Sequence, residues 1–432
     1  MRYQNLAKEF FISNRKKLIN KMIDNSMLML FSPDKYHRNG DQYYKFRQNS
    51  NLYQLSGINQ EETILILTQF GSHIESEEML LIKEVNNMQR IWHGEKLKIG
   101  EAQQLSGIDH VKWNTEFDAI LRQQLSWVKN IYYEASPNHK SFDGNPTSNM
   151  RRMNALKEEF PEKSFIPINS IMDEIRLIKQ EEELVAIRKA VSITRGAYDR
   201  ILSNTKPDMF EYEVEAEITY EFIRQGASGH AYIPIVASAR NACFLHYVDN
   251  DKLMKDGDLL LLDFGAEYAN YAADCSRTIP INGKFSPRQA DCYNAVLEVF
   301  KKAKAIYIPG NTIDNINEQV GKWMQEKMVD LGLLSAEEIE KYEGEEPLYK
   351  KYFMHGTAHF IGLDVHDVGS KTTIFEKGML LSCEPGLYIE EEGIGIRIET
   401  DMLVADEPVD LMADFPITVE EIEREMSFGV LI

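Results

Sequence analysis

Short apolar runs, separated by polar and turn-rich stretches, recur through the first part of the chain. Four of them have the length of buried strands: Met27–Phe31, Thr63–Leu67, Met79–Ile82 and Lys129–Glu134. The segment Thr147–Phe160 has the spacing of a helix, and Pro161 helps to end it. Strands that alternate with helices in this way predict one α/β domain over residues 1–172.

A highly charged stretch, residues 173–183, follows this domain. It leads into Leu184–Ile201, where apolar residues recur at helical spacing. We therefore place a domain junction at 172/173. The charged run is typical of a solvated helix face, so it carries no functional prediction of its own.

From Gly229 onward the pattern becomes richer in strands, and two helical segments, Pro287–Ile306 and Asp314–Leu331, interrupt it. The apolar or alternating runs that predict these strands are Tyr232–Ala237, Leu259–Phe264, Ala272–Ile279, Met379–Ser382 and Leu387–Ile389. Residues 173–432 therefore predict a second domain that mixes strands and helices. The whole chain falls in the α/β (α+β) class.

The composition agrees with two folded domains. A chain of 432 residues suggests two or three domains at roughly 150 residues each. Apolar residues make up 43% and charged residues 27%, which is ordinary for a globular protein. The formal net charge of −20 repels phosphate backbones and anionic lipid surfaces. Neither nucleic acid nor a membrane is therefore expected as a partner.

Two further features predict a cytoplasmic protein. The segment Met1–Lys17 lacks the basic and then apolar pattern of a secretion signal, and no apolar run approaches the ~20 residues of a membrane helix. The chain has four widely spaced cysteines and no CxxC pair. Such cysteines are reduced thiols by default in the cytoplasm.

Two acids flank a predicted hairpin in the second domain. Asp263 ends the four-leucine run Leu259–Leu262, and Asp274 follows eleven positions later. A hairpin centred between Tyr268 and Ala269 would place the two acids directly opposite each other, with Cβ atoms about 5 Å apart. Two ionised carboxylates so close repel each other unless a cation lies between them. By itself such a pair is weak evidence, because two acids at hairpin distance are more often surface residues.

A second acidic pair repeats this arrangement. Glu384 and Glu399 are fifteen positions apart, with the polar turn Glu390–Gly393 near the centre. They too could face each other across a hairpin. Arg397 stands two positions before Glu399 and hence on the same strand face, where it could orient a substrate or a carboxylate. The alternative is that the acids around the turn form only an acidic loop.

Three of the ten histidines fall close together, at His355, His359 and His366. The spacing of the first two imitates the HExxH motif, but Gly356 stands where the glutamate of a zincin would be. Carboxylates with one or two imidazoles suit two adjacent ions such as Mn²⁺, Co²⁺, Fe²⁺ or Zn²⁺. Two such ions can hold a bridging hydroxide and stabilise an oxyanion, which is the chemistry of amide hydrolysis. The residues thus predict a dinuclear metallohydrolase.

The segments LLLDFGAEYANYAAD, HGTAHFIGLDVHD, CEPGLYIE and GIGIRIE together resemble the pita-bread metallopeptidases, and most closely aminopeptidase P, the Xaa-Pro aminopeptidases. In the N-terminal half, residues 46–57 resemble the matching segment of the same family. The resemblance implies a creatinase-type N-terminal α/β domain followed by a pita-bread catalytic domain. It also implies peptide substrates with proline second, and two divalent ions per chain, Mn²⁺ first among the candidates.

The resemblance also implies a role for each residue of the site. The implied metal ligands are Asp263, Asp274, His359, Glu384 and Glu399. Asp274 and Glu399 would bridge the ions, and Glu384 would also accept the proton of the attacking water. His246 would steady the peptide and its leaving group, and His366 would lie near the scissile carbonyl. Residues implied in binding substrate are Tyr232, His355, Tyr388 and Arg397.

Members of this family are usually dimers or larger oligomers, so a homodimer or homotetramer is expected. Trp92 matches a tryptophan that in relatives reaches the active site of a neighbouring subunit, although a core or surface tryptophan is the plain alternative. The nearest rival function is that of prolidase, which shares the ligands but acts on Xaa-Pro dipeptides. A binding module without catalytic activity, creatinase and methionine aminopeptidase fit less well, because the five ligands and the long N-terminal domain are all present.

Overall fold

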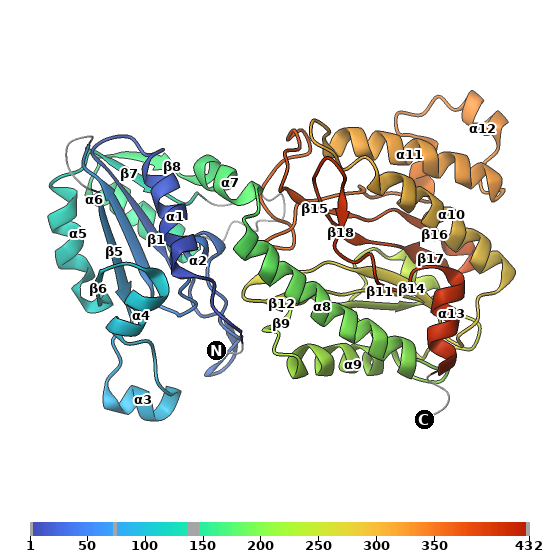
Figure 1. Cartoon of the computed structure of the whole chain (residues 1–432), viewed down its shortest axis with the longest axis horizontal. Coiled ribbons are helices and arrows are strands. Elements are labelled where there is room, and N and C mark those ends of the chain that lie inside the picture. The colour runs from blue at the N-terminus through green and yellow to red at the C-terminus, as the bar shows by residue number, and fades with distance from the viewer. Residues whose placement is uncertain (1–2, 72–75, 136–146, 429–432) are drawn as a thin grey trace. The chain divides into compact units, whose positions relative to one another are not determined.

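The computed structural model describes residues 3–71, 76–135 and 147–428. Contacts within the chain divide it into two compact units (Figure 1). Asn5–Arg176 forms one unit, and Leu177 onward, with the N-terminal end, forms the other. The helix α7 (Asn169–Leu177) spans the junction that the sequence predicts at 172/173. Among the described residues, no helix is both long enough and apolar enough to cross a membrane.

The unit Asn5–Arg176 is built on one six-stranded sheet in the order β6-β5-β4-β1-β7-β8. The strand β1 is parallel to β7 and antiparallel to β4. Its strands are β1 (Ser26–Phe31), β4 (Ile64–Gln69), β5 (Glu77–Ile82), β6 (His110–Trp113), β7 (Asn130–Tyr133) and β8 (Ser164–Pro167), with a separate hairpin of β2 (His37–Asn39) and β3 (Gln42–Tyr43). The four strands predicted here are confirmed. The hairpin, β6 and β8 are too short to form a recognisable apolar run, so they were not predicted.

Helices cover both faces of this sheet. The side chains of Leu28 and Leu30 on β1 pack in one core cluster, and those of Met27, Met29 and Phe31 in another. All six residues of β1 are buried, which explains its unbroken apolar run. The helices of this unit, besides α7, are α1 (Lys8–Ile19), α2 (Ser50–Ser56), α3 (Asn87–His93), α4 (Ile99–Ser106), α5 (Phe117–Leu125) and α6 (Ser148–Glu159). Of these, α1, α2 and α4 pack in the first cluster and α5 and α6 in the second.

The second unit contains antiparallel strands in several small sheets. Its strands are β9 (Gly229–His230), β10 (Ile235–Ser238), β11 (Leu259–Asp263), β12 (Ala266–Tyr268), β13 (Tyr271–Ala272), β14 (Ser276–Pro280), β15 (Leu380–Cys383), β16 (Gly386–Ile389), β17 (Ile394–Arg397), β18 (Thr400–Leu403) and β19 (Val409–Asp410). The strand predicted from Tyr232 begins only at Ile235, because Pro234 has no N–H to donate to a ladder.

Helices pack on both sides of these strands (Figure 1). They are α8 (Glu181–Asn204), α9 (Glu211–Arg224), α10 (Pro287–Lys304), α11 (Ile313–Asp330), α12 (Ala336–Lys341) and α13 (Val419–Phe428). The helices α8 and α9 contact β12 and β10, whereas α10 contacts β15, β16 and β17. The helices predicted for α8, α10 and α11 are confirmed. With these layers the second unit has the pita-bread fold that the sequence predicts.

The first predicted hairpin forms, but its turn lies one residue later than predicted, which shifts the strand pairing by two residues. Asp263 pairs with Ser276, not with Asp274, and the turn is centred between Ala269 and Asn270. Both of these residues have positive φ, 51° and 67°. Two successive residues with positive φ are typical of a type I′ turn, which fixes the register of the hairpin. Asp274 stands two positions before Ser276, so it is a diagonal neighbour of Asp263 and still on the same side of the hairpin.

The second hairpin has the predicted register. Pairs in β15 and β18, such as Cys383 with Thr400, and pairs in β16 and β17, such as Gly386 with Arg397, follow one continuous alignment. In that alignment Glu384 lies opposite Glu399. The prediction that these two acids face each other is therefore confirmed.

Candidate metal centre

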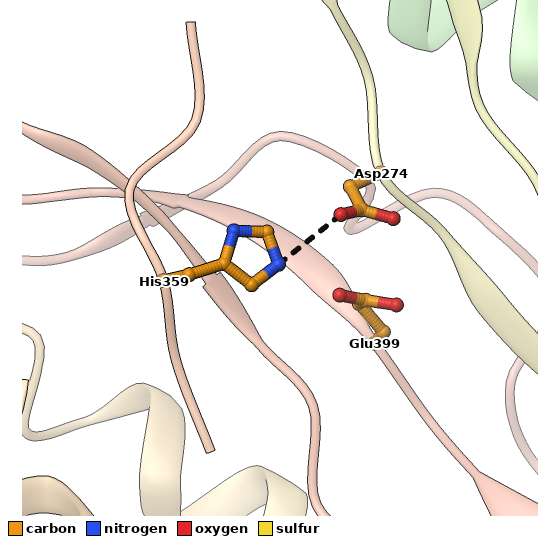
Figure 2. A group of neighbouring side chains, drawn as sticks. All are labelled: Asp274, His359 and Glu399. Carbon is orange, nitrogen blue, oxygen red and sulfur yellow. Dashed lines mark ion pairs between the residues drawn. The ribbon is translucent and has the colours of Figure 1, made fainter. Parts of the chain in front are cut away.

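Three side chains from different parts of the second unit converge in the structure. The ligand atoms of Asp274, His359 and Glu399 all lie within 4.8 Å of one another (Figure 2). His359 Nε2 is 3.3 Å from Asp274 Oδ2. Asp274 comes from the first hairpin, Glu399 from the second, and His359 from the segment that precedes β15. Two carboxylates and an imidazole at this spacing are a donor set for a divalent cation.

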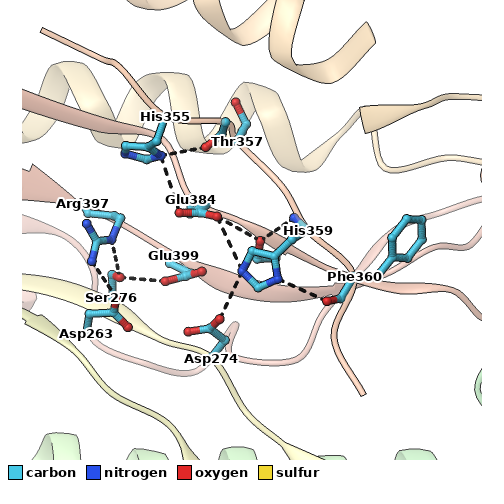
Figure 3. Close-up of polar contacts among 12 residues, drawn as sticks. Asp263, Asp274, Ser276, His355, Thr357, His359, Phe360, Glu384, Arg397 and Glu399 are labelled. Atoms are coloured by element: carbon cyan, nitrogen blue, oxygen red, sulfur yellow. Dashed lines mark hydrogen bonds and ion pairs between the residues drawn. The ribbon is translucent and has the colours of Figure 1, made fainter. Parts of the chain in front are cut away.

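Asp263 stands beside this group and is bound by two partners. Arg397 donates from Nη2 to Asp263 Oδ2 at 2.6 Å (Figure 3). The Tyr232 hydroxyl lies 2.7 Å from Asp263 Oδ1 and 2.6 Å from Asp274 Oδ1. A hydroxyl has one proton, so Tyr232 shares it between two carboxylates that belong to the same site. Arg397 thus orients a carboxylate, which is one of the two roles that its sequence position suggested.

Glu384 completes the set of acids. Its Oε1 lies 3.6 Å from His359 Nε2, and its Oε2 lies 3.6 Å from His355 Nδ1. Glu399 accepts a hydrogen bond of 2.7 Å from Ser276 Oγ, whose residue is the hairpin partner of Asp263. All five residues predicted as ligands therefore meet in one place (Figure 3).

The backbone around His359 fixes the direction of its ring. His359 N–H donates to Ser382 Oγ at 3.0 Å, and Ser382 N–H donates to the carbonyl of His359 at 2.8 Å. The other ring nitrogen, Nδ1, lies 3.2 Å from the carbonyl of Phe360. A hydrogen bond from Nδ1 to a carbonyl leaves Nε2 as the free electron-pair donor, which is the form that binds a metal.

Electrostatics show how closely these charges are packed. Burial raises the pKa of Glu384 to about 7, against the opposing charge of His359. Burial and the charge of Asp274 raise the pKa of Glu399 well above its usual range. Burial also raises the pKa of Asp263, although Arg397 opposes the shift. For His359, burial would lower the pKa, but the hydrogen bond to Asp274 and the charge of Glu384 outweigh it, and the pKa rises to about 9.

These shifts have one common meaning: the buried acids lack enough positive charge nearby to ionise at their normal pKa. Divalent cations supply that charge, and carboxylate oxygens with one imidazole nitrogen are ligands that such ions accept. The residues present therefore fit a metal centre.

A second set of polar groups lies next to the ligands and is satisfied internally. Arg397 Nη1 donates to the Tyr388 hydroxyl at 3.0 Å, and that hydroxyl is 2.7 Å from His355 Nε2. His355 Nδ1 is 2.7 Å from the carbonyl of Gly356. Burial and the charge of Arg397 lower the pKa of His355 to about 3, so its ring is neutral at neutral pH. A neutral ring that donates from Nδ1 accepts from Tyr388 at Nε2.

One cavity of about 400 Å³ brings the site together. Its wall contains all five predicted ligands, and His246, His355, His366, Tyr232 and Arg397. The ring of His366 lies 4.4 Å from that of His359, measured between centroids. The size suits a few residues of a peptide. Of the residues predicted to bind substrate, Tyr388 is buried behind this wall, and Trp92 lies in α3 of the other unit, with its side chain 77% exposed.

Several residues in and behind this wall carry no signal in the sequence. Lys371 and the apolar side chains of Ile233, Val248 and Val365 line the cavity, and Ser276 holds Glu399. An isolated lysine or apolar residue in a loop has no spacing that marks it, so only the folded chain reveals them.

Comparison with known proteins gives consistent matches. The profile of metallopeptidase family M24 matches residues 185–406, and that of the aminopeptidase P N-terminal domain matches residues 11–132. The Xaa-Pro aminopeptidase of Haemophilus influenzae is 34% identical over 98% of this chain and 98% of its own length. Zinc-substituted Escherichia coli aminopeptidase P, solved with product, superposes with a TM-score of 0.90 at 32% identity, covering 99% of each chain. The Escherichia coli enzyme with the inhibitor Pro-Leu gives a TM-score of 0.89 at 32% identity, covering 99% of this chain and 100% of that one.

Proposed function

The chain belongs to metallopeptidase family M24, and from this premise we propose that it removes the N-terminal residue from peptides whose second residue is proline. It is a hydrolase and a metallo-aminopeptidase. The observation that carries the proposal is the convergence of the five predicted ligands and three histidines on the wall of one cavity. The relatives that match this chain over nearly its whole length are Xaa-Pro aminopeptidases, which supports the same specificity.

Two divalent ions would be held by the five predicted ligands. Asp263 would serve one ion, His359 and Glu384 the other, and Asp274 and Glu399 both. When bound, such ions polarise the scissile carbonyl and make water acidic enough to attack at neutral pH. We propose Mn²⁺ as the native ion, with Co²⁺, Fe²⁺ or Zn²⁺ as alternatives; a donor set rich in carboxylates supports a hard ion first.

The protein's own side chains would carry the remaining steps. Glu384 would accept the proton of the attacking water, and its place beside His359 supports that role. His246 would steady the peptide and the departing nitrogen, and His366 would hold the scissile carbonyl. Both histidines line the cavity from loops and are exposed.

The pocket for proline would be formed by Tyr232, His355 and Arg397, with Tyr388 behind them. Proline has no N–H, and the bond before it is a tertiary amide. The ring nitrogens of His355 and the guanidinium of Arg397 are already engaged by neighbouring groups. None of these groups needs a hydrogen bond from a substrate N–H. A proline, which has no N–H, therefore leaves no group of this pocket unpaired. This arrangement supports recognition of proline over other residues.

The decisive experiment compares Xaa-Pro with Xaa-Pro-Yaa-Zaa as substrates of the metal-loaded protein. We expect cleavage of the tetrapeptide after Xaa. We also expect alanine in place of proline to cost about 10-fold or more in kcat/KM, which is about 1.4 kcal/mol. Hydrolysis of the dipeptide with no hydrolysis of the tetrapeptide would assign the chain to prolidase instead. Failure to cleave either substrate with any of the four metals would contradict the proposal as a whole.

Three further properties belong to this proposal. Residues 1–172 would act as the domain that limits entry to one residue before the scissile bond, and residues 173–432 as the catalytic domain. The protein would act in the cytoplasm, which its four unpaired cysteines support. It would assemble as a homodimer or homotetramer, with Trp92 of one chain reaching toward the site of another.

A further inference from the structure

His246 depends on its loop for its position. It lies in the connection between β10 and β11, residues 239–258, whose regular structure is one short 3₁₀ turn, Ala239–Cys243. The His246 side chain is exposed on the cavity wall and makes no hydrogen bond or ion pair with the described residues. Its ring is therefore placed by the backbone of the loop. A connection this long is usually functional. Its conformation must be held by contacts with the rest of the chain.

One buried side chain provides most of that fastening. Glu211, the first residue of α9, is fully buried and accepts five hydrogen bonds from this part of the chain. Its Oε1 accepts from Ser238 N–H at 2.8 Å, from Ser238 Oγ at 2.6 Å and from Asn241 Nδ2 at 3.3 Å. Its Oε2 accepts from the Tyr247 hydroxyl at 2.7 Å and from Lys252 N–H at 3.0 Å. The carboxylate thus joins the residues before His246 to the residues after it.

The five donors around position 211 favour the carboxylate of glutamate over the amide of glutamine. All five groups bring hydrogens, and an ionised carboxyl offers lone pairs on both oxygens. A glutamine would have to aim its NH₂ group either at Ser238 and Asn241 or at Tyr247 and Lys252. Either choice sets the NH₂ group against at least one backbone N–H, that of Ser238 or that of Lys252, which can only donate and would lose its partner. Burial and the bond to Glu211 raise the pKa of Tyr247, so its hydroxyl remains a donor.

The rest of the loop is held on two sides. Asn250 accepts from Val236 N–H at 3.0 Å and donates to Glu215 Oε2 at 2.9 Å, one helical turn after Glu211. On the other side Ala242 packs so closely on Gly395 that a Cβ on this glycine would lie 2.5 Å from Ala242. His246 lies between these attachments, on the stretch that Tyr247 ties down.

We propose that Glu211 is a positioning residue for His246: its carboxylate fixes the loop 239–258 so that the imidazole stands over the cavity. This inference rests on the proposed function for the catalytic importance of His246. Glu211 itself does not line the cavity.

Two variants and one control test it in the metal-loaded protein. Glu211→Gln and Tyr247→Phe should each lower kcat for an Xaa-Pro-Yaa peptide, the first by about 10-fold or more, because a small displacement of a catalytic group has a large effect on rate. KM and the content of two ions should change little. Tyr220→Phe is the matched control, because Tyr220 is on the same helix and 53% exposed; its kcat should equal that of the wild type.

A double-mutant cycle separates positioning from general damage. If Glu211 acts through His246, Glu211→Gln should lower kcat no further in a His246→Ala background. An equal loss in both backgrounds, or a Glu211→Gln enzyme with wild-type kcat, would overturn the inference.

Crystal structures give a readout that does not depend on activity. In Glu211→Gln the His246 ring should be displaced or lose its single position, while the five metal ligands stay in place. An unmoved ring would overturn the inference whatever the kinetics. A His246→Ala enzyme with wild-type kcat would instead contradict the role of His246 in the proposed function, and the position of the ring would still test Glu211.

Discussion

At the scale of single residues, the site is a set of buried acids whose charges are not balanced by the protein alone. Arg397 neutralises Asp263, and His359 pairs with Asp274. Glu399 and Glu384 keep pKa values above the usual range because burial and neighbouring carboxylates disfavour their ionised forms. Folding therefore brings together carboxylates whose ionised forms a bound cation would stabilise, and for this reason the site fits a metal centre.

Asp274→Asn should remove both ions and abolish turnover while the fold stays intact. The Asp274 carboxylate lies beside His359 and accepts a hydrogen bond from Tyr232. It also belongs to the group of ligand atoms that includes Glu399. An amide binds divalent ions weakly, so both sites lose affinity. Metal analysis together with circular dichroism checks this. Asp291→Asn, on the exposed side of α10, is the control and should keep two ions. An active Asp274→Asn protein with full metal content would contradict the ligand assignment.

His366→Ala should lower kcat by at least about 100-fold and leave the metal content unchanged. The ring lines the cavity beside His359 but is predicted to act on the peptide and not on an ion. Steady-state kinetics and metal analysis on the same preparation test both halves of this statement. His110→Ala, an exposed histidine in β6, should behave as wild type. Loss of metal in His366→Ala would mean that this residue is a ligand.

At the scale of elements, two hairpins carry the acids, and the spacing of each pair depends on strand register. A one-residue slip moves a side chain to the other face of a strand. In the first hairpin a close backbone approach also holds the two strands together. A Cβ at position 265 would lie 1.8 Å from the carbonyl oxygen of Ala273, so only glycine fits at this position.

Gly265→Ala should therefore destabilise the second unit, by about 1–3 kcal/mol, and weaken metal binding at the same time. The methyl group must push the Ala273 backbone away, which separates Asp263 from Asp274. Thermal unfolding and metal titration measure the two effects. Gly100→Ala in α4 is the control, because no atom lies within 4 Å of its Cβ position; it should stabilise the protein by about 0.5–1 kcal/mol. Unchanged metal affinity in Gly265→Ala would show that the hairpin does not set the spacing of the ligands.

At the scale of the whole molecule, metal binding and folding stability are linked. The metal-free protein should lose stability as the pH rises from 7 to 9. The folded-state pKa of His359 is raised from 6.5 to about 9 and covers this range, whereas that of Glu384 is raised from 4.5 to about 7, so its contribution is lost mainly below pH 7. Each group holds a proton in the folded state that the unfolded chain has already released, so this stabilisation is lost as the pH rises through the folded pKa.

The stability of the metal-loaded protein should instead rise with pH over part of this range. Ions compete with protons for the same ligands and bind more tightly as the pH rises. The melting temperatures of chelated and Mn²⁺-loaded protein, measured side by side from pH 7 to pH 9, provide the comparison. A melting temperature that rises with pH in the chelated protein would contradict the shifted pKa values.

Trp92→Ala tests whether the site is completed by a second chain. Trp92 lies on α3 beside Met88 and Ile91, and all three side chains are at least 70% exposed. If the tryptophan covers a neighbouring site, its removal should raise KM for longer peptides more than for tripeptides. Trp127→Ala is the matched control, since Trp127 is 64% exposed in the same unit. Equal KM values for the two variants would remove this role from Trp92.

The sequence alone determined the strands with long apolar runs, the second acidic pair and the class of chemistry. Uninterrupted apolar runs such as Met27–Phe31 can be buried on both faces, so their strand character is local information. The register of Glu384 and Glu399 was also predictable, because one polar turn lies between two apolar strands. The resemblance of the motifs to a known family predicted five ligands, and the structure brings all five side chains together on one cavity wall.

Only the tertiary structure decided how these parts meet. The first hairpin turns one residue later than predicted, with Ala269 and Asn270 in the turn. Alanine rarely takes positive φ, so its presence in the turn could not be predicted from local sequence. Ser276, Lys371 and Glu211 have no spacing that marks them, since their partners lie far away in sequence. A local pattern reports which face of an element is buried, but the neighbour of a polar side chain is chosen by packing. For this reason the predicted ligands could be named from the sequence, whereas the groups that contact them could be found only in the folded chain.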